Sequence, residues 1–213
     1  MSIKTPLKCD LDNSELLEHG ITHSSEDQDS PAVRISSRLE ESNPEIDFKN
    51  SYRLARLFGL APEQKTFLFK MLQNLLPTRE RLHRCGKSPT ASCNFCDHPE
   101  DTLDHLLSCP QSLEVSAPLL SCLASQLDNI TTKDIIHLNF HTAESWDLPA
   151  VWILSTCLMF VWEKRVAGKK AKLDECRAEL SARIALLSQT KWKHYSLHNS
   201  ALLLNEAINL HFV

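Results

Sequence analysis

The stretch of sequence that decides the fold spans residues 93–109 and reads CNFCDHPEDTLDHLLSC. Its candidate metal ligands are Cys93, Cys96, His105 and Cys109, in the order Cys-x2-Cys, eight residues, His-x3-Cys. Two thiolates separated by two residues can bind one metal ion from a single tight turn. His105 and Cys109 lie about one turn apart on a helix of ~3.6 residues per turn, so they point the same way.

One imidazole and three thiolates complete a tetrahedral Zn²⁺ site and leave no open position for chemistry. We therefore predict that the cofactor is a structural Zn²⁺, which favours a binding module over an enzyme. His98 and Cys85 are nearby substitutes for these ligands. His98 ranks below the four because it is too close to Cys96 in the sequence for easy joint ligation.

The composition is that of an ordinary globular protein, with 42% hydrophobic and 23% charged residues among 213. Only 4 glycines are present, which favours helices over a turn-rich sandwich. Residues 1–50 contain 11 acidic and 5 basic residues, a charge of −6, whereas residues 51–213 contain 18 basic and 16 acidic residues, a charge of +2. The acidic, serine-rich leader cannot bury much surface, so we expect residues 1–46 to be disordered.

Apolar residues recur at intervals of three and four in several segments, which is the pattern of amphipathic helices. Thr78 and Asp147 are candidate N-caps, and residues 129–139 are predicted to be a connector with a short apolar turn. We predict an all-α fold: a helical array with an inserted Cys-Cys-His-Cys zinc loop and a disordered acidic N-terminal tail. The predicted helices span about residues 52–60, 62–76, 78–82, 102–109, 113–127, 147–162, 173–187 and 199–210.

These elements suggest three regions. Residues 1–46 form the leader, residues 47–112 contain helices and the zinc-binding loop, and residues 113–213 form a C-terminal helical region.

The most apolar run is residues 148–162, which is 15 residues long. A membrane-spanning helix needs ~20 apolar residues, so we predict a buried helix here and no membrane association. The chain opens on polar residues without the apolar core of a signal peptide, and its remaining cysteines have no paired spacing. We therefore expect free thiols and an intracellular location, in the nucleus, the cytoplasm or both.

Basic residues flank the acidic zinc loop on both sides. Before it lie Arg79, Arg81, Arg84 and Lys87, which we predict to contact phosphates of RNA or DNA; a solvated helix face explains them equally well. After it, around Gly168, lies a second cluster made of Lys164, Arg165, Lys169, Lys170 and Lys172.

Sequence motifs of catalysis are missing. We find no adjacent aspartates of a polymerase hairpin, no glycine-rich phosphate loop and no Gly-x-Ser-x-Gly elbow. No small-molecule substrate is evident either. We therefore expect that the chain is not an enzyme by itself.

Three segments together resemble a known family. Residues 69–82 read FKMLQNLLPTRERL, residues 93–96 read CNFC, and residues 100–110 read EDTLDHLLSCP. They resemble the zinc-binding region that follows the reverse transcriptase domain in non-LTR retrotransposons, the long interspersed elements. The segments LPAVW at 148–152 and RAELSAR at 177–183 are similar to helices downstream of that region, so the resemblance covers about residues 50–210.

The resemblance implies a C-terminal piece of a retroelement polyprotein, in which this region helps to hold template RNA or target DNA. The family's ligands correspond to Cys93, Cys96, His105 and Cys109. A reverse transcriptase core becomes a possible partner. Polymerase activity is not implied, because the upstream polymerase and endonuclease motifs are not in this sequence.

Two alternatives stay open. The chain is a protein-interaction module if the helix at residues 152–162 and the apolar seam at residues 173–187 bind a helical partner. It is otherwise an inert, truncated retrotransposon relic.

Overall fold

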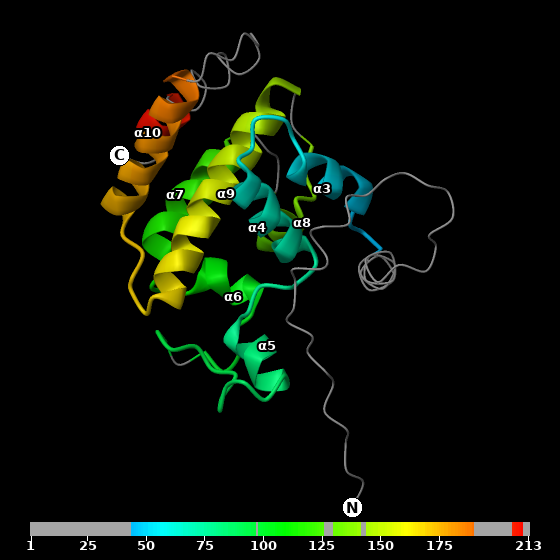
Figure 1. Cartoon of the computed structure of the whole chain (residues 1–213), viewed down its shortest axis with the longest axis vertical. Coiled ribbons are helices and arrows are strands. Elements are labelled where there is room, and N and C mark those ends of the chain that lie inside the picture. Colours follow the sequence, from blue (N-terminus) through cyan, green and yellow to red (C-terminus); the bar gives the residue numbers. More distant parts are fainter. Residues whose placement is uncertain (1–43, 97, 126–129, 142–143, 190–205, 211–213) are drawn as a thin grey trace, which may run out of the picture.

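The structure is a computed structural model that describes residues 44–96, 98–125, 130–141, 144–189 and 206–210. Within these ranges the chain forms helices and no strands, so the prediction of an all-α fold is confirmed (Figure 1). Nearly all of the predicted acidic leader lies outside the described residues. The helices are α3 (Phe48–Ala55), α4 (Pro62–Leu72), α5 (Arg79–Arg84), α6 (Leu103–Ser108), α7 (Leu113–Ala124), α8 (Thr132–His137), α9 (Glu144–Val166) and α10 (Leu173–Gln189).

Helix α9 lies at the centre of the helical array. It packs against α3, α4, α7 and α10, and every residue from 149 to 161 is buried. A helix that is hydrophobic on all sides belongs in a core, so the predicted buried helix is confirmed. Among the described residues no helix has the length and hydropathy to span a membrane.

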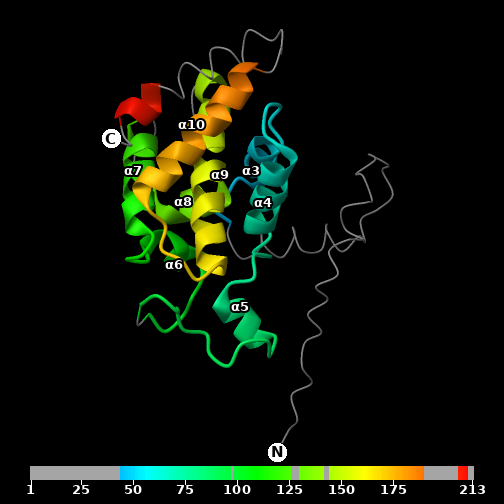
Figure 2. The same cartoon turned by 60° about the vertical axis from the view of Figure 1, so that its left-hand side comes forward.

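A single apolar core joins the helices before and after the metal loop. It extends from Leu54 in α3 to Ile208 in the short helical stretch 206–210. The rest of the predicted last helix lies outside the described residues. In two views α5 and the metal loop lie together at one end of the array, next to α6 (Figures 1 and 2).

The apolar residues named below, which a protein-interaction module would use to bind a partner, are buried against other helices of the same chain. In α9, Trp152 and Leu158 are 3% and 1% exposed. The apolar seam of α10 faces α9 and α7 through Cys176, Leu180 and Ile184, all buried. These apolar residues therefore form the core of this fold instead of an exposed docking surface.

Several helix boundaries differ from the prediction, and one helix was not predicted. Helix α3 begins at Phe48, because the side chain of Asp47 caps it and accepts from the backbone N–H of Asn50 at 3.0 Å. Residues 132–137 form α8 where a connector was expected, with a capping box between Thr131 and Asp134. The apolar residues of α8, Ile135 and Ile136, are adjacent and show no spacing of three or four, which is why the sequence pattern missed this helix.

Asp147 is inside α9 and does not cap it, since α9 begins at Glu144. Its carboxylate instead forms an ion pair with Arg53 of α3 at 2.8 Å. The predicted cap Thr78 does begin α5, because its hydroxyl accepts from the backbone N–H of Arg81 at 3.3 Å.

A buried polar contact holds α4 against α9. Gln64 is 1% exposed, and its side-chain amide donates to Ser155 Oγ at 2.9 Å and to Thr156 Oγ1 at 3.1 Å. Its Oε1 accepts from the backbone N–H of Ala61, at the start of α4, at 2.9 Å. Each buried polar atom must find such a partner or lose the free energy of hydration.

We expect the substitution Gln64→Met to lower the free energy of unfolding by about 1–3 kcal/mol. The methionine side chain keeps the volume but leaves buried polar groups without a partner. Denaturant unfolding followed by circular dichroism would measure the loss. As a control, the same substitution in a Ser155→Ala/Thr156→Val background should cost less, and equal losses in the two backgrounds would contradict the argument.

Candidate metal centre

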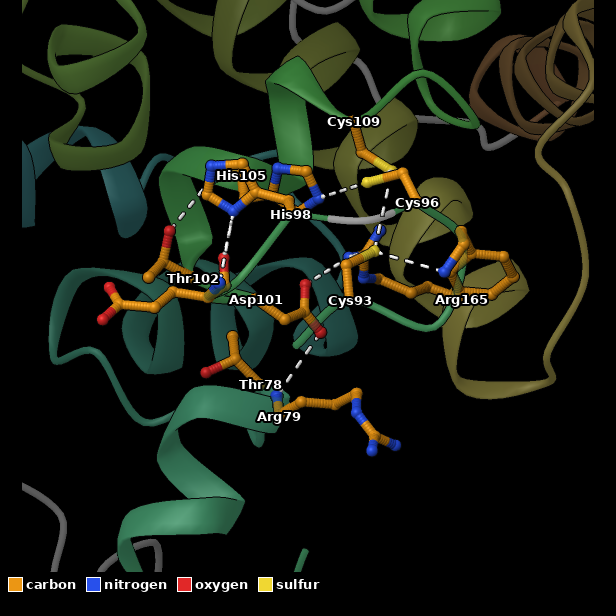
Figure 3. Close-up of polar contacts among 12 residues, drawn as sticks. Thr78, Arg79, Cys93, Cys96, His98, Asp101, Thr102, His105, Cys109 and Arg165 are labelled. Carbon is orange, nitrogen blue, oxygen red and sulfur yellow. Dashed lines mark hydrogen bonds and ion pairs between the residues drawn. The ribbon is translucent and has the colours of Figure 1, made fainter. Parts of the chain in front are cut away.

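The four predicted ligands come together in one cluster. Their ligand atoms all lie within 4.8 Å of one another. The Sγ atom of Cys109 is 3.9 Å from that of Cys93 and 4.0 Å from that of Cys96. The Nε2 atom of His105 is 3.3 Å from Cys96 Sγ (Figure 3).

These separations fit a tetrahedral zinc ion. With Zn–S bonds of about 2.3 Å, the edges between sulfur atoms of a tetrahedron are about 3.8 Å long. The observed sulfur–sulfur distances of 3.9 and 4.0 Å match that edge. Three sulfurs and one imidazole also form the ligand set typical of closed structural zinc sites.

Backbone hydrogen bonds shape the loop that holds the first two ligands. The N–H of Cys93 donates to the carbonyl of His98 at 3.0 Å, and the N–H of Asp101 donates to the carbonyl of Ala91 at 2.8 Å. Inside the turn, the N–H of Phe95 donates to Cys93 Sγ at 3.3 Å. The turn therefore orients the Cys93 sulfur.

The third ligand, His105, lies on α6, and the fourth, Cys109, is the C-cap residue that ends this helix. The Thr102 hydroxyl accepts from the backbone N–H of His105 at 3.2 Å, and the Cys109 N–H donates to the His105 carbonyl at 2.8 Å. Leu106 and Leu107 on the same helix are buried in the core. Core packing thus fixes the helix that carries His105 and ends at Cys109.

Arg165 reaches the cluster from the last turn of α9. Its Nη2 lies 3.0 Å from Cys93 Sγ, it forms an ion pair with Asp101, and its guanidinium lies 5.3 Å from the centre of the Phe95 ring (Figure 3). The sequence placed Arg165 in the second basic cluster and Asp101 in the acidic zinc loop. Neither signal could show that they meet beside a metal ligand.

The surroundings shift the pKa values of the ligands. Burial alone would raise the pKa of the Cys93 thiol, but the Phe95 N–H and the Arg165 guanidinium outweigh it and lower that pKa. Burial, with neighbouring Cys93 and Cys109, raises the pKa of Cys96. Burial, together with the electrostatic influence of His98 and Arg165, lowers the pKa of His105, which favours the neutral imidazole that binds metals.

A family model described as zinc-binding in reverse transcriptase matches residues 50–115. The matched segment includes all four ligands, so residues 50–115 are similar to the zinc-binding module found in reverse transcriptases. Together with the ligand geometry, the match confirms the structural zinc prediction. Comparison with curated proteins and with solved structures gave no match.

The two substitute ligands lie outside the cluster of four. His98 stacks on the His105 ring, with centroids 4.2 Å apart and planes 13° apart, and its Nδ1 lies 2.7 Å from the carbonyl of Glu100. The ring of His98 therefore covers one face of the zinc-binding imidazole.

The predicted phosphate-binding residues lie on α5 and just after it, in two different environments. Arg79 donates to the Ser92 carbonyl at 2.8 Å and to Thr90 Oγ1 at 3.0 Å, and Arg81 donates to the Asn74 carbonyl. Arg79 therefore ties α5 to the zinc loop.

The other two predicted residues are directed outward. The Arg84 side chain is 60% exposed and pairs with Glu80 one turn earlier at 2.6 Å, and Lys87 is exposed. An exposed ion pair of this kind contributes little to stability. Arg84 can therefore exchange Glu80 for another anion at small cost.

We expect protein purified without added metal to contain one zinc per chain, and the Cys93→Ser/Cys96→Ser double variant to contain none, because it lacks two of the three thiolates. Metal analysis by mass spectrometry would measure both. Cys122→Ala, which removes a buried free cysteine outside the cluster, is the matched control and should keep its zinc. Wild-type protein that is folded and free of metal would contradict the assignment.

We also expect a strong chelator or acid to loosen residues 67–110, because thiolate ligands compete with protons and zinc binding is coupled to folding. Amide hydrogen exchange should quicken first in the loop and in α6. The Cys93→Ser/Cys96→Ser protein should not respond further to the chelator. Unchanged exchange in wild-type protein shown to be metal-free would refute this coupling.

Proposed function

We propose that the chain is a retroelement-derived, zinc-stabilised helical module that assists nucleic-acid binding by a reverse transcriptase and has no catalytic role alone. The family match at residues 50–115 supports the link to reverse transcriptases. The resemblance of the flanking segments supports an origin in a non-LTR element. The proposal implies RNA or DNA and a reverse transcriptase core as partners, and a location in the nucleus, the cytoplasm or both.

The attachment of α5 to the zinc loop carries this proposal. Two hydrogen bonds from Arg79 join the helix to loop residues 90 and 92, so the loop holds the helix in a fixed position. A basic surface held rigidly loses less conformational entropy when it binds a phosphate backbone than a flexible one does.

Within the predicted set Arg79, Arg81, Arg84 and Lys87, we assign direct phosphate contact chiefly to the last two. Arg84 and Lys87 are exposed, whereas Arg79 and Arg81 already donate to groups of the chain itself. The first two arginines then have a second role, which is to hold α5 in place. Replacing them would disturb the loop as well as the surface.

We expect the double substitution Arg84→Ser/Lys87→Ser to weaken binding to RNA and DNA at low salt. The slope of log affinity against log salt should fall by about 1 for each phosphate contact removed. Fluorescence anisotropy over a salt series would measure both quantities.

The matched control is Lys49→Ser/Arg56→Ser, which removes one exposed lysine and one exposed arginine from α3 and the residue after it. It changes the net charge by the same amount, so a general charge effect would appear in both proteins. Equal affinity and slope in the two variants would sink the assignment to α5.

A further inference from the structure

One partly buried arginine connects the central helix to the zinc ligands. Arg165 and Cys93 are 72 residues apart in the sequence, yet Nη2 of the arginine is 3.0 Å from the thiol sulfur. Arg165 also lies outside residues 50–115, where the family match ends. The contact therefore joins the zinc module to a part of the chain that the match does not include.

This contact is enclosed by the protein. The side chains of Arg165 and Asp101 are only 9% and 6% exposed. Two charges removed from water are costly unless each has partners of good geometry. Asp101 has a second donor, the backbone N–H of Arg79 at 3.4 Å, and the Phe95 ring covers the guanidinium at 5.3 Å.

The charges also explain why an arginine belongs at this position. Three thiolates and one neutral imidazole leave a bound Zn²⁺ site with one excess negative charge. Both contacts come from one guanidinium nitrogen, Nη2, whose N–H groups lie in a fixed plane and can donate to the Asp101 carboxylate and to the Cys93 sulfur. A lysine ammonium keeps the charge but lacks the planar group whose donor directions are fixed and which lies against the Phe95 ring.

We propose that Arg165 is a positioning residue of the zinc centre: from α9 it donates to the Cys93 thiolate and fixes Asp101, so that the loop retains its metal. The zinc-retaining unit then extends from the loop to the end of α9. Hydrogen bonds from groups around the direct ligands orient those ligands, and their loss typically weakens metal binding by about 10- to 100-fold.

The first test compares full-length wild-type protein with Arg165→Met and Arg165→Lys. Zinc affinity would be measured by competition with a chromophoric chelator, and the rate of zinc release by stopped flow. We expect Arg165→Met to lose about 10- to 100-fold in affinity and to release zinc faster. Arg165→Lys should lie between the two, because it keeps the charge but not the fixed planar donor geometry.

The control is Arg183→Met on α10, which removes an arginine that pairs with Glu179 at 2.5 Å and lies 3.7 Å from Glu63. It should retain zinc like the wild type. Circular dichroism would show whether each variant keeps its helices. If Arg165→Met fails to fold, Arg165→Lys carries the test, and wild-type zinc affinity in that folded variant would overturn the proposal.

A second measurement distinguishes a direct effect of Arg165 on the Cys93 sulfur from an effect that depends only on its ion pair with Asp101. With Co²⁺ in place of zinc, the thiolate-to-metal charge-transfer bands report directly on the sulfur ligands. Arg165→Met should shift these bands, and it should also do so in an Asp101→Asn background. The decisive comparison is between Asp101→Asn protein and the Asp101→Asn/Arg165→Met double variant. If the two have the same bands and the same metal affinity, Arg165 acts only through Asp101, and the proposed role of its contact with Cys93 is overturned.

Discussion

The fold of the zinc module depends on bringing four ligand atoms from two pieces of backbone to within 4.8 Å of one another. Residues 93–96 of the loop form no helix, and α6 has only six residues. Isolated helices shorter than about 12–15 residues are marginal in water. Zinc binding by His105 and the burial of Leu106 and Leu107 are therefore both expected to stabilise this short helix.

The central helix α9 connects the zinc ligands to the apolar core of the chain. The middle of α9 is enclosed by other helices, which fixes the position of the helix axis. The last turn of α9 places Arg165 next to the zinc ligand Cys93. Because interiors are close-packed, a shift of α9 would move the guanidinium away from Cys93. The polar contacts around the zinc ligands thus depend on the packing of the apolar core.

The same logic divides the basic residues of α5 into two kinds. Sequence spacing treats Arg79 and Arg84 alike, as members of one basic run. In the structure Arg79 attaches the helix to the zinc loop, whereas Arg84 is exposed and pairs with Glu80 on the same helix. A surface that binds phosphate needs exposed basic side chains and also residues that fix the backbone carrying them, because a fixed backbone loses less conformational entropy on binding.

The sequence by itself determined the zinc ligands, the all-α class, the buried central helix and the Thr78 cap, because each depends on spacing within one short segment. It missed α8, which shows no helical period in its sequence. It also misplaced the start of α9, because the Asp147 carboxylate pairs with Arg53 of α3 and does not cap the helix. Only the tertiary structure decided that Arg165 meets Cys93 and Asp101. No local pattern carries that contact, because it depends on where helix packing directs a side chain 72 residues away.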